Sequence, residues 1–190
     1  MERFTNRRIF IGAILIGMVF VLGSAAYVKR NALVAAETLR AKMSLKTLTD
    51  TISVSEQLKL DQIASIREGR YATIIDLRPD GEAEGQPDAA TMKAAANREG
   101  LNFFYVPVPH GDIPDSAVQA LGKVLDESRG PILLYCRSGR RAARTWSLVE
   151  ASRQDGMDAK AILEAVKASG QSADDLRAAI EARIAKRVAQ

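Results

Sequence analysis

The single cysteine of the chain stands where a buried strand turns into a helix. Residues 132–135, Ile-Leu-Leu-Tyr, indicate the strand, and residues 142–148 indicate the helix. Backbone N–H groups at a helix N-terminus bind anions, and positive charge beside a thiol makes the thiol a better nucleophile. We therefore predict that Cys136 is a nucleophile facing an oxyanion, and that the residues after it form the anion-binding loop: Arg137, Ser138, Gly139 and Arg140.

The composition bounds the class of protein. The 190 residues suffice for one ordinary domain with extra segments, and 47% apolar residues can form a packed core. Aromatic residues make up only 5% and the net charge is +4, which argues against a nucleic-acid-binding surface. A single cysteine excludes an internal disulfide, and a single histidine, His110, argues against a catalytic zinc site. We expect no metal and no cofactor.

The N-terminus contains a candidate membrane segment. Residues 9–28 carry no charge, and the length of this segment suits one bilayer crossing. Residues 1–8 form a basic flank. We interpret 9–28 as an uncleaved transmembrane anchor, with a cleavable signal peptide ending near residues 24–26 as the alternative. The prediction is a single-pass protein of a bacterial inner membrane. The arginines before the span favour a periplasmic domain, which is the orientation we predict, whereas the basic residues after it favour the opposite orientation.

The rest of the chain alternates strands and helices. A polar linker is predicted at 29–50, and strands are predicted at 52–55, 71–77, 103–106 and 132–135, with helices at 61–68, 87–99 and 113–128 between them. This pattern predicts an α/β fold with a central, mostly parallel sheet flanked by helices. The main domain is assigned to residues 51–153, and residues 154–190 are expected to form helices packed on it.

Polar residues follow several of the predicted strands. Cys136, Arg78 and the segment His110-Gly111-Asp112 each come directly or shortly after a strand. The carboxyl ends of parallel strands meet at one edge of a sheet, which is where ligands bind in such folds. These residues can therefore converge although they are far apart in the sequence.

From about Thr51 to Val149 the chain resembles the phosphatase-like domain of beta-lactamase hydrolase-like proteins. The matching stretches follow the family's order and spacing: 76–82 (Asp-Leu-Arg-Pro-Asp-Gly-Glu), 85–87 (Gly-Gln-Pro), 130–133 (Gly-Pro-Ile-Leu) and 136–139 (Cys-Arg-Ser-Gly). That family looks like dual-specificity and tyrosine phosphatases in fold, so the resemblance implies a cysteine-phosphatase-like domain. Some of its members are labelled as sulfur transferases.

The resemblance implies roles for three residues. In a cysteine phosphatase the thiolate attacks phosphorus, loop N–H groups and an arginine hold the oxygens, and an aspartic acid protonates the leaving oxygen. Cys136 would be the nucleophile. Asp112 would be the acid, because residues 105–112 resemble the acid loop of small dual-specificity phosphatases. Arg141 would be the oxyanion clamp, since its planar guanidinium suits two oxygens. The expected partner is a phosphorylated protein or small molecule.

Two departures from the phosphatase signature leave other functions open. That signature has five residues between cysteine and arginine, but this chain has Ala142 at that position, and Arg141 leaves only four between. The usual preceding histidine is replaced by Tyr135. Four residues is the spacing of rhodanese-like sulfurtransferases, so a persulfide on Cys136, with a sulfur donor as partner, is the second hypothesis. The third is a membrane-anchored module that binds phosphorylated ligands without turnover.

Each candidate residue also has a structural interpretation. Cys136 could be a small core residue. Asp112 could cap the helix that follows it, with Asp115 as a competing cap and a weaker candidate for the acid. Arg78 could contact the substrate or could only brace the turn that follows it.

Overall fold

The computed structural model describes residues 27, 30, 31, 34, 38 and 43–189. It separates into two units, Met1–Thr38 and Leu39–Gln190, and the second contains the sheet and its helices. The predicted basic flank and, apart from Tyr27, the predicted anchor lie outside the described residues, so both stay predictions. Within the described part, no helix is both long enough and apolar enough to span a bilayer.

The sheet contains, within the described residues, five strands: β1 (Lys46–Thr47), β2 (Ile52–Ser55), β3 (Thr73–Asp76), β4 (Asn102–Tyr105) and β5 (Ile132–Tyr135). Their order is β1-β2-β5-β3-β4. The neighbouring pairs β2–β5, β5–β3 and β3–β4 are parallel, and β1 is antiparallel to β2. Every residue of β2, β3 and β5 is buried, as is typical of parallel strands covered on both faces. The predicted α/β fold with a mostly parallel sheet flanked by helices is confirmed.

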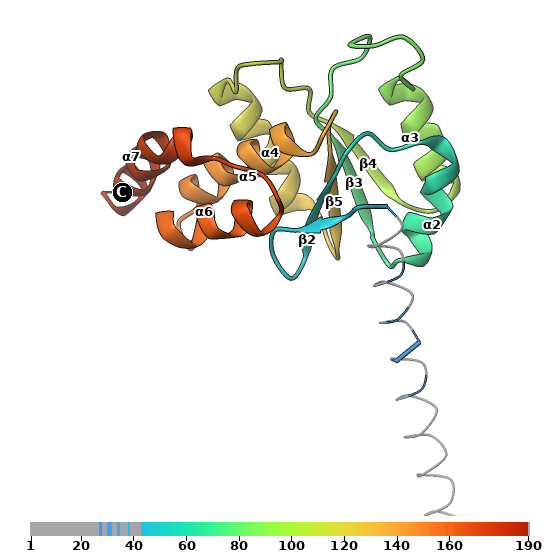
Figure 1. The fold of residues 1–190 in the computed structure, drawn as a ribbon, viewed down its shortest axis with the longest axis horizontal. Helices are drawn as coiled ribbons and strands as arrows, with labels where there is room; N and C mark the ends of the chain where they lie inside the picture. The colour runs from blue at the N-terminus through green and yellow to red at the C-terminus, as the bar shows by residue number, and fades with distance from the viewer. Residues whose placement is uncertain (1–26, 28–29, 32–33, 35–37, 39–42, 190) are drawn as a thin grey trace, which may run out of the picture. The chain divides into compact units, whose positions relative to one another are not determined.

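Helices cover both faces of this sheet (Figure 1). α2 (Ile63–Glu68) and α3 (Ala89–Arg98) pack in one core, and α4 (Asp115–Glu127) and α5 (Arg140–Ser152) pack in the other. Successive residues of a strand point to opposite faces. Leu133 and Tyr135 therefore enter the α2–α3 core, whereas Leu134 and Cys136 enter the α4–α5 core. This alternation directs the thiol to the face on which α5 begins.

The C-terminal helices α6 (Ala159–Ala168) and α7 (Arg177–Val188) pack against α5. Ile162, Val166 and Ile180 are fully buried in the α4–α5 core. Arg187 donates hydrogen bonds to several carbonyl oxygens at and beyond the end of α5, those of residues 150, 151, 153, 156 and 157. One guanidinium thus gives the carbonyls at and beyond the end of α5 a charged donor, and it fastens α7 to that end of α5.

Most of the element bounds differ by a residue or two from the sequence prediction, and two differences have a clear cause. The segment predicted as a linker, 29–50, contains β1 and the buried residues Leu45 and Leu48; a two-residue strand is too short to show an alternating pattern. The helix predicted from Pro87 begins instead at Ala89. The carboxylate of Asp88 caps it by accepting a hydrogen bond from the Thr91 N–H at 2.7 Å.

Candidate active site

The loop after β5 turns into α5 at Gly139. Gly139 has a φ of 80°, the left-handed region that glycine adopts without strain. A Cβ at this position would lie 3.3 Å from the carbonyl oxygen of Ser55 and 3.4 Å from the side-chain nitrogen of Gln171. Both the backbone conformation and the tight space therefore require glycine here.

The N–H groups of this loop are available to an anion. The carbonyl of Arg137 accepts a hydrogen bond from the Gln57 N–H, and the carbonyl of Ser138 accepts one from the Gln171 side chain. Within the described residues, the N–H groups of residues 137–141 donate to no protein acceptor. They belong to the loop and first turn that open α5, the arrangement that binds phosphate and sulfate at other helix N-termini.

Cys136 lies on a cavity of about 470 Å³. Its thiol is free, and the residue is 1% exposed. Segments far apart in the sequence form the walls: the loop before α4, the loop and first turns of α5, and the 3-10 helix η2 (Asp174–Leu176). Six of the predicted site residues meet here, namely Asp112, Cys136, Arg137, Ser138, Arg140 and Arg141. Gly139 shapes the loop but lines a smaller neighbouring cavity.

Two aspartates line this cavity, Asp112 and Asp175, and Asp175 is paired with Arg144. Asp112 is the one that the sequence analysis proposed as the acid. It is exposed, and its carboxylate accepts a hydrogen bond from the Ile113 N–H at 2.8 Å. It does not cap α4, whose N-cap is Pro114 without a side-chain hydrogen bond. Asp115 pairs with Arg183 of α7 and is not among the described residues that line the cavity. The geometry thus favours Asp112 over Asp115 as the candidate acid.

Arg141 is held by a carboxylate that the sequence analysis did not single out. Its two terminal nitrogens donate to the two oxygens of Glu82 at 2.7 and 2.8 Å, and Nη1 also donates to the carbonyl of Val108 at 2.5 Å. The hydrogen bonds from Arg141 hold the pKa of Glu82 below its ordinary value, so the pair stays charged at neutral pH. Glu82 belongs to a stretch matched by the resemblance, yet a lone Glu after a turn gives no signal of an enclosed ion pair.

The unusual cysteine–arginine spacing still leaves an arginine on the cavity. Ala142, the position of the arginine in the phosphatase signature, is fully buried in the α4–α5 core. An arginine there would meet apolar side chains. Arg141, one residue earlier, lines the cavity together with Cys136.

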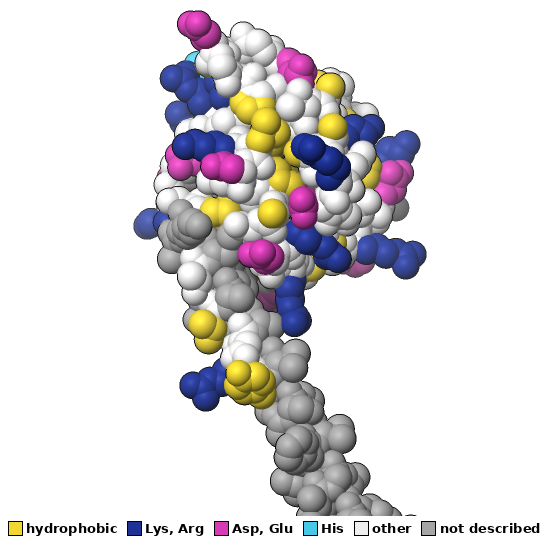
Figure 2. All heavy atoms as spheres, turned by 90° about the vertical axis from the view of Figure 1, so that its right-hand side faces the viewer, with side chains coloured by type: hydrophobic (Ala, Val, Ile, Leu, Met, Phe, Trp, Pro, Cys, Tyr) yellow, Lys and Arg dark blue, Asp and Glu magenta, His cyan; other side chains and the backbone are white. Residues whose placement is uncertain are grey.

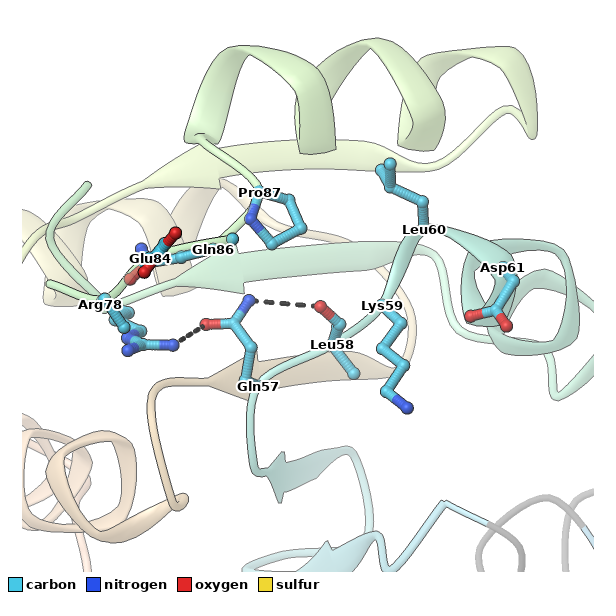
Figure 3. A pocket seen from close by; sticks show the side chains of 11 residues that line it. Gln57, Leu58, Lys59, Leu60, Asp61, Arg78, Glu84, Gln86 and Pro87 are labelled. Carbon is cyan, nitrogen blue, oxygen red and sulfur yellow. Dashed lines mark hydrogen bonds between the residues drawn. The ribbon is translucent and has the colours of Figure 1, made fainter. Parts of the chain in front are cut away.

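Arg78 lies outside the Cys136 cavity. Its guanidinium donates to Gln57 Oε1 at 2.8 Å and to Glu82 Oε2 at 3.0 Å, and the residue is only 6% exposed. Figure 3 shows it at one end of a separate cavity of about 560 Å³, beside Gln57 and opposite Leu60 and Asp61. Instead of a place on the Cys136 cavity, the structure gives Arg78 a bracing contact to Glu82, which in turn holds Arg141.

Asp76 is a buried acid beside Tyr135, the residue that precedes Cys136. Asp76 ends β3, opposite Tyr135 of β5, and is 1% exposed; its carboxylate accepts a hydrogen bond from the Arg78 N–H at 2.8 Å. Burial raises the pKa of Asp76 to about 6. Burial, together with the charge of Asp76, also raises the pKa of Tyr135, so its hydroxyl stays protonated.

We expect Asp76→Asn to stabilise the protein above pH 6. The native state keeps a proton on Asp76 up to about pH 6, whereas the ordinary value is 3.8, so stability falls as pH rises through this window. The variant should remove this fall in the free energy of unfolding between about pH 4 and 6. It should therefore raise the free energy of unfolding at pH 8 by about 2–3 kcal/mol. Urea titrations of the wild type and the variant at pH 4.5 and 8 measure the free energy of unfolding and its dependence on pH. Asp155→Asn, a change at an exposed acid, is the control, and an unchanged slope in Asp76→Asn would contradict the prediction.

Charges elsewhere on the surface are mixed. On the face that Figure 2 displays, Lys and Arg side chains alternate with Asp and Glu, without a stripe of one sign. Arg137 and Arg140, by contrast, are exposed beside Cys136. The arrangement fits a local anion site.

Comparison with known proteins identifies similar sequences. The family model described as "Beta-lactamase hydrolase-like protein, phosphatase-like domain" matches residues 44–153. A beta-lactamase hydrolase-like protein of Xylella fastidiosa (strain Temecula1) is 33% identical over 108 residues, which are 57% of this chain and 25% of that protein. The match thus spans about a quarter of the length of that curated relative.

Solved structures share the fold. The crystal structure of a candidate phosphatase from Neisseria meningitidis Z2491 is 29% identical, with a TM-score of 0.65, covering 74% of this chain and 99% of that one. The structure of P. aeruginosa TpbA in complex with phosphotyrosine is 16% identical, with a TM-score of 0.52 over 76% of this chain and 91% of that one. At such low identity the second match shows the fold alone.

Proposed function

The chain belongs to the family of the phosphatase-like domain of beta-lactamase hydrolase-like proteins, and on that premise we propose that it is a cysteine-dependent phosphatase. The Cys136 sulfur attacks the phosphorus of a phosphomonoester, and the bond from phosphorus to the leaving oxygen breaks. Asp112 gives its proton to that oxygen. Water, deprotonated by Asp112, then attacks the phosphocysteine, and the products are inorganic phosphate and the free thiolate.

One observation carries this proposal: Cys136 and Asp112, which come from different loops, line the same cavity. The available N–H groups of residues 137–141 and the braced guanidinium of Arg141 can hold the phosphoryl oxygens as charge develops in the transition state. A merely structural cysteine requires none of these neighbours. That a protein of the same fold is seen with phosphotyrosine supports a phosphorylated substrate.

A persulfide-carrying sulfurtransferase is the second candidate, favoured by the four-residue spacing between Cys136 and Arg141. In that reaction the Cys136 thiolate takes the outer sulfur of thiosulfate and releases sulfite, and cyanide then removes that sulfur as thiocyanate. Asp112 has no part in either step. Membrane anchoring through residues 9–28 is part of the proposal for either chemistry, and cell fractionation tests it.

The two chemistries separate in parallel assays of the full-length chain, one with 4-nitrophenyl phosphate and one with thiosulfate plus cyanide. We expect phosphate release, and we expect Asp112→Asn to lower kcat by about 100-fold. Asp115→Asn is the matched control, because Asp115 pairs with Arg183 away from the cavity, and it should change kcat less than about threefold.

Other outcomes contradict the phosphatase. Thiocyanate formation that does not depend on Asp112, with a persulfide mass on Cys136, would establish the sulfurtransferase instead. Inactivity in both assays, together with protection of Cys136 from alkylation by phosphate, would identify a binding module.

A further inference from the structure

A second arginine on the Cys136 cavity is already occupied. Arg144 lies one turn after Arg140 on α5 and lines the cavity. Its Nη1 and Nη2 donate to the two carboxylate oxygens of Asp175 at 2.5 and 2.7 Å, and Nη1 also donates to the Ser172 carbonyl at 3.2 Å. The Arg144 side chain is 14% exposed, whereas that of Asp175 is 61% exposed. The carboxylate is thus the solvent-facing, displaceable half of the pair.

Asp175 comes from a part of the chain that the family model does not cover. That model ends at residue 153, whereas Asp175 belongs to η2, in the connection between α6 and α7. This connection runs past α5 in Figure 1, and its Gln171 also donates to the carbonyl of Ser138 at 3.1 Å. The connection therefore forms one wall of the cavity and touches the anion-binding loop.

The bidentate contact determines what Arg144 can bind. A planar guanidinium uses the same pair of N–H donors for a carboxylate and for a phosphoryl group. A ligand with one phosphoryl group bound by the loop after Cys136 leaves this pair intact. A second phosphoryl group that approaches Arg144 has to displace Asp175 and also meets its negative charge.

We propose that Asp175 is a specificity-determining residue that makes the cavity favour ligands with a single phosphoryl group over ligands with two adjacent ones. The proposal rests on the proposed function, in which residues 137–141 bind the first phosphoryl group. It places the preferred substrate among simple phosphomonoesters and disfavours diphosphates. Removal of the Asp175 charge releases Arg144 to bind a second phosphoryl group.

Equilibrium binding tests the proposal without turnover. The full-length wild type and its variants are titrated by calorimetry with orthophosphate and with methylenediphosphonate, a diphosphate analogue that cannot be hydrolysed. The wild type should prefer orthophosphate. Asp175→Asn should raise the affinity for the diphosphonate roughly tenfold relative to that for orthophosphate, because a like charge is lost and a charged donor pair is gained.

Two further variants make the test specific. Asp174→Asn removes the same charge one residue away, from a carboxylate that accepts from the Ser172 hydroxyl and does not bind Arg144, so it should change the ratio less than about twofold. Arg144→Gln combined with Asp175→Asn should return the ratio to the wild-type value.

An equal gain in Asp174→Asn, or a gain that persists without Arg144, would overturn the specificity role. So would an unchanged ratio in Asp175→Asn while orthophosphate still binds, and in that case the phosphatase proposal stands. A wild type that binds neither anion contradicts both proposals.

Discussion

The Cys136→Ser variant is expected to lose at least about a thousandfold in the rate of aryl phosphate hydrolysis while keeping its fold. The substitution replaces the sulfur by an oxygen, and a serine hydroxyl is not ionised at neutral pH. The rate of 4-nitrophenol release measures the loss. Because the residue is buried in the α4–α5 core, thermal unfolding followed by circular dichroism has to accompany the kinetics.

The same variant should still bind orthophosphate, because the N–H groups of residues 137–141 remain in place. Ser116→Ala is the control, since Ser116 is exposed on α4 and is not among the described residues that line the cavity. It should change the rate less than about threefold. If Cys136→Ser released phosphate at the wild-type rate, another group would have to be the nucleophile, and the proposed mechanism would be wrong.

The sequence indicated that Cys136 and Asp112 can converge, although the same argument included Arg78, which lies outside the cavity. Each follows a predicted strand, and the carboxyl ends of parallel strands meet at one edge of the sheet. The strand order, with β5 between β2 and β3, was not predictable, because all three strands are similar short apolar runs. That order is nevertheless what puts Cys136 near the middle of the edge, between the loops that follow β2 and β3.

The partners of the arginines could not be predicted from the sequence. Glu82 and Arg141 are 59 residues apart, and Arg144 and Asp175 are 31 apart. In a sequence, an acid in a turn looks like an ordinary solvated charge, and only tertiary packing shows which arginine it faces. The pattern of a cysteine and several arginines thus indicated an anion site. Only the structure shows that Arg141 and Arg144 are paired with carboxylates, whereas Arg137 and Arg140 are exposed.

That difference leads to the second large effect: Arg141→Lys is expected to lower kcat/KM for an aryl phosphate by about 100-fold. A lysine keeps the charge but has no planar fork, so it cannot bind both oxygens of Glu82 and still present a second edge to the phosphoryl group. The Val108 carbonyl also loses its donor at this position. Steady-state kinetics with 4-nitrophenyl phosphate measures the loss.

Arg137→Lys is the matched control for this substitution. Arg137 lines the same cavity, but it is exposed and forms no ion pair with any described residue, so the change should cost less than about threefold. Glu82→Gln keeps one acceptor for Arg141 and should fall between the two arginine variants. If Arg141→Lys is as active as Arg137→Lys, the guanidinium held by Glu82 is a structural brace and does not clamp the oxyanion. The cysteine–arginine spacing would then say nothing about the chemistry, and the loop N–H groups would have to stabilise the transition state without it.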